Sequence, residues 1–277
     1  MILGLNVSMS EGYVLITGAS SGLGEAFARA YVKQGRSVII TARRESRLQA
    51  LAKELKNNRV EVQVLAMDLN DVAAPGAIFE LCQNKGWVIE GLVNNAGLGW
   101  QIDLADLTDD QLHRMLHVNM VSLSRLMHLF LPSMVKRRSG FILNIASTAA
   151  FQPIPHFSVY GATKAYVVAL TEAVHEEVRR YGVTVTCLCP GPVDTEFQQA
   201  AGMDKRFFAM TQEIEPVVAK GLSLVERNRA LGWSSISQRI SSLATEVMPH
   251  WLRRKLAGSI IEECLRRQEK RRRADGV

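Results

Sequence analysis

Short apolar runs rich in β-branched residues alternate with helical patterns along this chain, and the alternation predicts an α/β fold. The first run leads directly into a glycine-rich turn that opens a helix. Strands that alternate with helices imply right-handed crossovers and a parallel sheet. We therefore expect a Rossmann-type doubly wound parallel sheet in three αβα layers. It forms a single domain over residues 1–235, and a basic helical C-terminal extension follows over residues 236–277.

The composition is that of a globular protein with a sizeable core. The 277 residues are 47% hydrophobic and 22% charged, and no apolar run approaches the roughly 18 residues of a membrane-spanning helix. The first 11 residues lack the basic and apolar regions of a signal peptide. The four cysteines fit buried residues in a reducing cytosol. We expect a cytoplasmic protein, with a membrane-peripheral location as the alternative that the tail leaves open.

Hydrophobic periodicity places the elements in order. The predicted strands lie at residues 13–16, 37–41, 60–67, 88–93, 140–146, 183–189 and 231–235. The predicted helices run from the glycine turn to Gly35 and then over residues 47–56, 74–84, 108–136, 158–181 and 215–226. Thr108 is a suitable N-cap for the fourth helix, and Pro132 is expected to interrupt it.

The glycine turn after the first strand, at residues 17–24, has the properties of a phosphate cradle. Its glycines permit a tight turn and the close approach of a pyrophosphate, which binds at the positive end of the following helix. We predict that a dinucleotide contacts this turn through Gly18, Ser20, Ser21, Gly22, Leu23 and Gly24.

The second strand ends at Ala42-Arg43-Arg44, where an acidic residue would bind the ribose 2′-hydroxyl of NAD(H). A basic residue instead suits the 2′-phosphate of NADP(H), and Arg43 is the candidate. The competing interpretation is a solvated pair of arginines that ends the strand. We expect NADP(H) in preference to NAD(H).

Tyr160 and Lys164 stand four residues apart at the head of a long helix, so their side chains share one face. A cation near a phenol favours the phenolate and lowers its pKa, which suits the phenol for proton transfer. Ser147, at the end of the fifth strand, can add a hydroxyl hydrogen bond to the same reacting oxygen. Taken alone, a Tyr and Lys pair at this spacing is more often a solvated helix face.

These pieces together resemble the short-chain dehydrogenase/reductase family over residues 13–197. The resemblance rests on the glycine turn and on later pieces in family order, which are Asp68, Asn94-Asn95-Ala96-Gly97, Asn119, Ser147, Tyr160-x-x-x-Lys164 and Pro190-Gly191. It implies an NAD(P)-dependent oxidoreductase that transfers a hydride. Tyr160 would be the general acid or base, Ser147 would polarise the carbonyl, and Lys164 would lower the Tyr160 pKa and bind the nicotinamide ribose.

The resemblance also implies a role for residues outside the glycine turn. Asn119 would position Lys164 through a water relay. The remaining cofactor contacts would come from Asp68, Leu69, Asn95, Ala96, Gly97, Tyr160, Lys164, Pro190, Gly191, Val193 and Thr195. His113 and His117 have a metal-like spacing of four residues on a helix, but no motif supplies a further ligand, and we expect no metal.

The region over residues 195–214 is expected to form a substrate lid. It carries Phe197, Met203, Phe207, Phe208 and Met210, which suggest an apolar substrate, although the same residues also suit a closed core. Residues Phe151, Pro153, Ile154 and Phe157 would form the opposite wall.

The C-terminal tail carries most of the net charge of +6. Residues 251–277 contain nine Lys and Arg against four Asp and Glu, a balance of +5, so the charge does not argue for nucleic-acid binding by the whole chain. The stretch 240–265 is amphipathic. It either packs on the domain, lies on an anionic membrane surface, or binds a partner or second protomer.

The sequence therefore predicts an NADP(H)-dependent oxidoreductase that interconverts an apolar ketone or aldehyde and an alcohol. The expected partners are a small-molecule substrate and further copies of the chain in a dimer or tetramer, with no nucleic acid. The alternative is a dinucleotide-binding regulatory or membrane-associated protein without turnover, against which the intact Ser147, Tyr160 and Lys164 argue.

Overall fold

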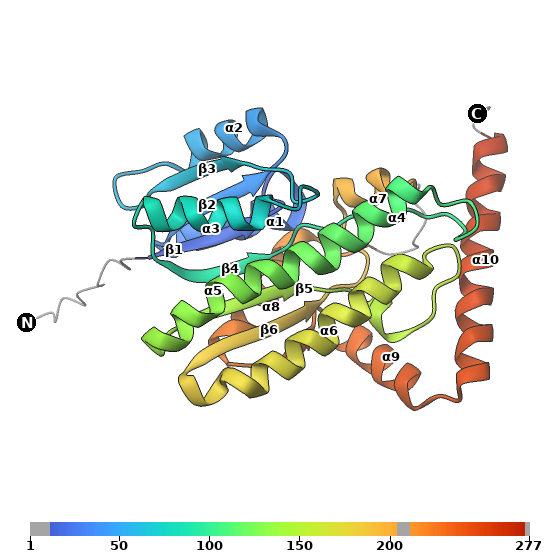
Figure 1. Cartoon of the computed structure of the whole chain (residues 1–277). Coiled ribbons are helices and arrows are strands. Elements are labelled where there is room, and N and C mark those ends of the chain that lie inside the picture. Colours follow the sequence, from blue (N-terminus) through green and yellow to red (C-terminus); the bar gives the residue numbers. More distant parts are fainter. Residues whose placement is uncertain (1–11, 204–210, 275–277) are drawn as a thin grey trace, which may run out of the picture.

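The computed structural model describes residues 12–203 and 211–274, with side chains up to residue 267. Seven strands of these residues form one parallel sheet in the order β3-β2-β1-β4-β5-β6-β7 (Figure 1). The strands are β1 (Tyr13–Thr17), β2 (Ser37–Ala42), β3 (Val62–Ala66), β4 (Ile89–Asn94), β5 (Gly140–Ile145), β6 (Val183–Cys189) and β7 (Leu231–Trp233). Strand order reverses between β1 and β4, which creates the crevice where doubly wound sheets bind ligands. The predicted fold class is confirmed.

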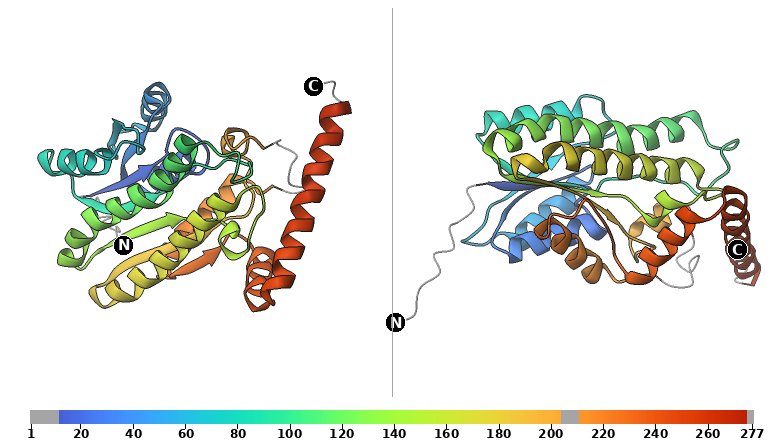
Figure 2. Two further views of the ribbon diagram at one scale, coloured as in Figure 1. Left: turned by 45° about the vertical axis from the view of Figure 1, so that its right-hand side comes forward. Right: turned by 90° about the horizontal axis from the view of Figure 1, so that it is seen from below.

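Helices cover both faces of the sheet (Figure 2). One face carries α3 (Ala74–Asn84), α4 (Asp109–Leu116), α5 (Leu123–Arg137) and α6 (Ser158–Val178), and the other carries α1 (Gly22–Lys33), α2 (Glu45–Leu55) and α8 (Ile214–Glu226). The strands supply both cores because side chains alternate between faces. Leu15 of β1 joins the first core, and its neighbours Val14 and Ile16 join the second.

Buried polar contacts fix α6 to the sheet. Asn94 donates to Asn144 at 2.9 Å, and Asn144 donates to Thr171 of α6 at 2.9 Å. One turn further along α6, His175 Nδ1 lies 2.9 Å from the carbonyl oxygen of Val185 in β6. Since buried polar groups are costly unless they are paired, these contacts favour one position of α6 over the strands. That position places the head of α6 at the carboxyl end of β5.

Some predicted boundaries were wrong. The third strand begins at Val62 rather than residue 60, because Val60 instead forms an isolated antiparallel bridge with Asn57. The predicted helix 108–136 contains a π-helical segment, η1 (His117–Ser122), and continues through Pro132 as α5. The last strand ends at Trp233, two residues earlier than expected. Short 3-10 segments, η2 (Thr148–Phe151) and η3 (Arg179–Tyr181), flank α6.

The tail forms two helices, not the single amphipathic stretch expected. These are α9 (Ile236–Val247) and α10 (His250–Ala274), separated at Met248-Pro249. Figure 2 shows α10 at the edge of the molecule, and α9 lies near its start. Ala257 and Ile261 of α10 are buried against the rest of the chain. Among the described helices, none has the length and apolar composition needed to cross a membrane.

Candidate active site

A cavity of about 590 Å³ lies at the carboxyl edge of the sheet, beside the point where strand order reverses. Nearly all the predicted site residues line it. They are Gly18, Ser20, Ser21, Gly22, Leu23, Arg43, Asp68, Leu69, Asn95, Ala96, Gly97, Ser147, Tyr160, Lys164, Pro190, Gly191, Val193 and Thr195. Gly24 and Asn119 do not line the cavity and lie behind its wall. Among the described residues, no group of three or more His, Cys, Asp and Glu is placed to hold a metal ion.

The glycine turn is braced against the end of β4. Asn95 donates its side-chain amide to the Thr17 carbonyl at 2.9 Å, and the Thr17 hydroxyl accepts from the backbone N–H of Asn95 at 2.9 Å and of Ala96 at 3.0 Å. A Cβ at Gly24 would lie 2.4 Å from the carbonyl oxygen of Gly18. Gly24 therefore acts by letting α1 approach the turn closely. The turn, the start of α1 and the cavity together fit a dinucleotide pyrophosphate.

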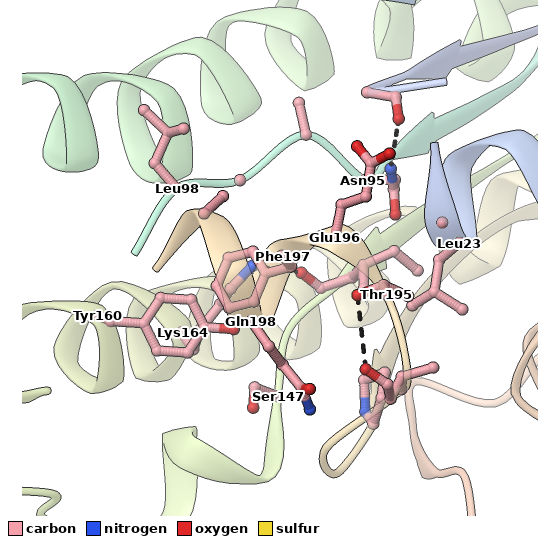
Figure 3. Close-up of a pocket in the computed structure, with 18 of the residues that line it drawn as sticks. Leu23, Asn95, Leu98, Ser147, Tyr160, Lys164, Thr195, Glu196, Phe197 and Gln198 are labelled. Atoms are coloured by element: carbon pink, nitrogen blue, oxygen red, sulfur yellow. Dashed lines mark hydrogen bonds between the residues drawn. The ribbon is translucent and has the colours of Figure 1, made fainter. Parts of the chain in front are cut away.

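Tyr160, Lys164 and Ser147 meet at the opposite end of the cavity (Figure 3). Tyr160 and Lys164 come from the first two turns of α6, and both are buried. Lys164 donates to the Ile145 carbonyl at 2.8 Å, and its Nζ lies 5.6 Å from the centre of the Tyr160 ring. Ser147 follows β5 and caps η2 by accepting from the N–H of Ala149. The predicted group is thus brought together.

The electrostatics of this group differ from the sequence prediction. Burial raises the pKa of Tyr160 above its usual value, and the hydrogen bond with Ser147 offsets only part of that change. Burial also lowers the pKa of Lys164 to about 8. The sequence prediction that Lys164 lowers the Tyr160 pKa differs from this outcome, because desolvation of the buried phenol is the largest effect and the opposing contribution comes from Ser147.

Asn119 lies in the π-helical segment η1 and is buried. It donates to the Leu98 carbonyl at 2.8 Å and to the Thr163 hydroxyl at 3.0 Å, and it accepts from the Leu98 N–H at 2.8 Å. These contacts join the loop after β4 to the turn of α6 that carries Lys164. The π-helical turn is the local feature that places Asn119 between Leu98 and Thr163. Turns of this kind often occur at functional sites. The water relay to Lys164 stays a prediction.

The two arginines after β2 have different surroundings. Arg44 donates to the hydroxyls of Ser20 at 3.1 Å and Ser21 at 2.8 Å, and it pairs with Glu196 at 2.7 Å. Arg43 lines the cavity, and its side chain makes no hydrogen bond or ion pair with any residue in the described part of the chain. The competing interpretation, a solvated pair of arginines, therefore does not describe Arg44, whose contacts the sequence did not predict.

Glu196 links the start of the predicted lid region to two arginines that follow β2. It lies at the start of α7 (Glu196–Ala200) and binds Arg44 and also Arg47, the latter at 2.5 Å. These hydrogen bonds hold the pKa of Glu196 low, at about 2. No local sequence signal could identify this contact, because about 150 residues separate its partners.

The substrate end of the cavity has an apolar wall. Predicted wall residues Ile154 and Phe157 line it, as do the lid residues Phe197 and Met203. Of the remaining predicted residues, Phe151 and Pro153 do not line this cavity, while Phe207, Phe208 and Met210 lie outside the described residues. Helix α10 also contributes, through Ile260 and Ile261. The tail is thus part of the site wall, which the sequence pattern could not reveal because it does not specify where an amphipathic helix docks.

Gln198 is a further site residue that the sequence analysis missed. It lies in α7 and lines the cavity, and only 4% of its surface is exposed. Neither its amide nitrogen nor its amide oxygen has a hydrogen-bond partner within the described structure. Figure 3 shows its side chain extending from α7 toward Ser147. An unpaired buried amide costs about 1–3 kcal/mol, so this group is suited to a polar ligand atom near Ser147.

The sequence profile of the family described as short chain dehydrogenase matches residues 12–206. An oxidoreductase of Staphylococcus epidermidis is 32% identical over 215 residues, which cover 78% of this chain and 92% of that protein. Sulfoacetaldehyde reductase 2 of Chromohalobacter salexigens is 38% identical over 191 residues, which cover 66% of this chain and 73% of that protein.

A solved structure is also similar throughout most of its length. The short-chain dehydrogenase from Sphingobium yanoikuyae, in complex with NADPH, has a TM-score of 0.79 and 30% sequence identity. The match covers 84% of this chain and 92% of that one. The likeness therefore extends from sequence motifs to the arrangement of the sheet and its helices.

Proposed function

The chain belongs to the short-chain dehydrogenase family, and we propose that within it this protein is an NADP(H)-dependent reductase of apolar ketones that uses Tyr160 as the general acid. Membership makes it an NAD(P)-dependent oxidoreductase that acts on carbonyl or alcohol groups of small molecules. The cofactor preference, the role of each site residue and the substrate class are parts of the proposal.

One observation carries the proposal. The phenol of Tyr160 and the hydroxyl of Ser147 lie at one end of a cavity whose other end is the glycine turn. An ordinary phenol titrates at about pH 10, so the Tyr160 hydroxyl carries a proton at neutral pH that it can give to a carbonyl oxygen. The choice of reduction as the direction rests on the NADP(H) assignment below. Ser147 is the second hydroxyl available to the same oxygen.

The proposed role of each residue follows from its position in the cavity. A bound dinucleotide supplies the hydride to the carbonyl carbon. Ser147 donates a hydrogen bond to the carbonyl oxygen, and Tyr160 transfers its proton to that oxygen. Lys164, held on Ile145, keeps a positive charge near the phenolate that this transfer leaves. Asn119 fixes the loop at Leu98 relative to α6, and so orients the reacting groups.

Arg43 and Arg44 support NADP(H) over NAD(H). Both line the cavity at the end of β2, the position where an acidic residue would repel a phosphate. Arg43 makes no ion pair with a described residue, so its charge is available to a 2′-phosphate. Arg44 already binds Ser20, Ser21 and Glu196. We assign the phosphate to Arg43 and the shaping of the turn to Arg44.

The substrate proposal joins the apolar wall to Gln198. Ile154, Phe157, Phe197 and Met203 suit a hydrocarbon chain or ring. Gln198 is the unpaired amide beside Ser147. We propose that it binds a second polar group of the substrate, such as a carbonyl two carbons from the reacting one. A 3-oxo ester with an apolar chain has this pattern.

Replacing Tyr160 with Phe should lower kcat by about 10²–10⁴-fold, because it removes the proton donor. NADPH affinity, measured by fluorescence titration, should change by less than about threefold. Tyr166→Phe is the matched control, because Tyr166 lies in the same helix but is partly exposed, and its hydroxyl contacts Ser124. That variant should retain full activity. Substantial turnover by Tyr160→Phe would refute the proposed acid.

Arg43→Asp should shift the ratio of kcat/KM for NADPH over that for NADH toward NADH by roughly 10–100-fold, the value of a lost charge-assisted hydrogen bond. Arg44→Gln should weaken both cofactors similarly, because Arg44 shapes the turn that both share. If Arg44→Gln shifts the NADPH-to-NADH ratio and Arg43→Asp does not, then Arg44, not Arg43, binds the phosphate.

Gln198→Leu tests the second polar contact. With the wild type, kcat/KM should be roughly 10–100-fold higher for a 3-oxo ester than for a plain ketone of the same chain length, as expected for a hydrogen bond in a buried site. The substitution should remove this preference and leave plain-ketone turnover intact. The Gln198 assignment fails if the preference is absent from the wild type, or persists in Gln198→Leu.

A further inference from the structure

Helix α9 directs its apolar side to solvent. Ile236, Ile240, Leu243 and Val247 are 78%, 63%, 41% and 86% exposed. Their spacing of four, three and four residues places them on one face of the helix. An exposed apolar stripe of this kind marks an interaction surface rather than ordinary scattered surface residues.

The opposite, polar face of α9 is the one that packs on the domain. Ser242 is buried, and the Ser234 hydroxyl lies within hydrogen-bond distance of the side-chain amides of Gln212, at 2.7 Å, and Gln238, at 2.6 Å. Gln238 also packs directly on Gly191, where a Cβ would lie 2.0 Å from the Gln238 amide nitrogen. Ser235 caps the helix by accepting from the N–H of Gln238. Rolling α9 to bury its apolar stripe would break these contacts, so the outward stripe is specified by the packing.

Cationic and aromatic side chains accompany the stripe. Arg239 lies on α9, and Arg254 and Lys255 lie in the first turns of α10, which begins three residues after α9 ends. None of these three forms an ion pair with a residue that the structure describes. Trp251 is exposed beside them, with its ring 5.9 Å from the Lys255 ammonium. Glu246 is the acidic side chain in this stretch of α9.

We propose that α9 and the first turns of α10 form a docking surface for an anionic lipid bilayer. The docking surface is defined as Ile236, Arg239, Ile240, Leu243, Val247, Trp251, Arg254 and Lys255, and it excludes Arg253, whose guanidinium is partly buried and lies 2.9 Å from His250 Nδ1. Apolar residues with Trp and flanking cations are the combination that binds the interfacial region of such membranes. A symmetric contact with a second copy would instead bring the same cations of two chains together. The charge on this surface therefore favours lipid over self-association.

The docking surface is continuous in sequence with the wall of the cavity. Helix α10 carries Arg254 and Lys255 at its start, and two turns later it carries Ile260 and Ile261, which line the cavity. Ile260 is also largely exposed. Membrane binding itself does not rest on the proposed function, and its test needs no turnover.

The test is co-flotation of the full chain with vesicles at 0.15 M salt, a condition that retains electrostatic attraction. Vesicles of phosphatidylcholine with 30% phosphatidylglycerol are compared with pure phosphatidylcholine. The wild type should float with the anionic vesicles at least about tenfold more than with the neutral ones. Ile240→Ser/Val247→Ser should lose most of this binding, and Arg239→Ser/Arg254→Ser should weaken it.

Val72→Ser/Leu104→Ser is the matched control, because these two side chains are similarly exposed but lie elsewhere on the molecule. It should float like the wild type. Unchanged NADPH binding and thermal midpoint establish that each variant is folded. The proposal is overturned if the wild type does not bind, binds both vesicles equally, or keeps its binding in Ile240→Ser/Val247→Ser. A wild-type dimer that this double substitution dissociates, without vesicle binding, would assign the surface to a second copy.

Discussion

The contact between the Lys164 ammonium and the Ile145 carbonyl is the constraint on which the site depends. It joins the catalytic face of α6 to the carboxyl end of β5 at 2.8 Å. The Asn94–Asn144–Thr171 chain and the contact of His175 with β6 hold the same helix along its length. A buried cation is costly unless it is paired. The Ile145 carbonyl that accepts the hydrogen bond from Lys164 therefore also fixes the first turns of α6, and with them the position of Tyr160.

Burial gives the two ionisable groups of this site complementary properties. The Tyr160 pKa is raised, and the Lys164 pKa is lowered to about 8. Desolvation disfavours the charged form of both groups, the phenolate of Tyr160 and the ammonium of Lys164. Catalysis by positioned groups of this kind depends on orientation more than on intrinsic reactivity. The polar contacts of Asn119 and Thr17, which only brace loops, therefore matter as much as the reacting hydroxyls.

The sequence predicted the fold and most of the site because both depend on local patterns. The strand–helix alternation, the glycine turn and the spacing of Tyr160 and Lys164 can be seen within a few residues of one another. The remaining features depend on distant contacts. Glu196 meets Arg44 across the cavity, Gln198 is unpaired only in the folded chain, and α9 packs by its polar side. Desolvation of Tyr160 also has no sequence signature, and it reversed the expected direction of its pKa. Assembly into a dimer or tetramer stays a prediction.

The central claim is that the protein reduces an apolar ketone with NADPH as the hydride donor, through the buried group of Ser147, Tyr160 and Lys164. The most direct measurement follows NADPH absorbance with the wild type and a panel of carbonyl compounds. The panel spans short ketones, 3-oxo esters and thioesters, steroids and long-chain ketones. The account predicts NADPH oxidation with apolar members of the panel, matched by formation of the alcohol. Tight binding of NADPH without oxidation by any carbonyl would contradict it and would favour a dinucleotide-binding protein without turnover.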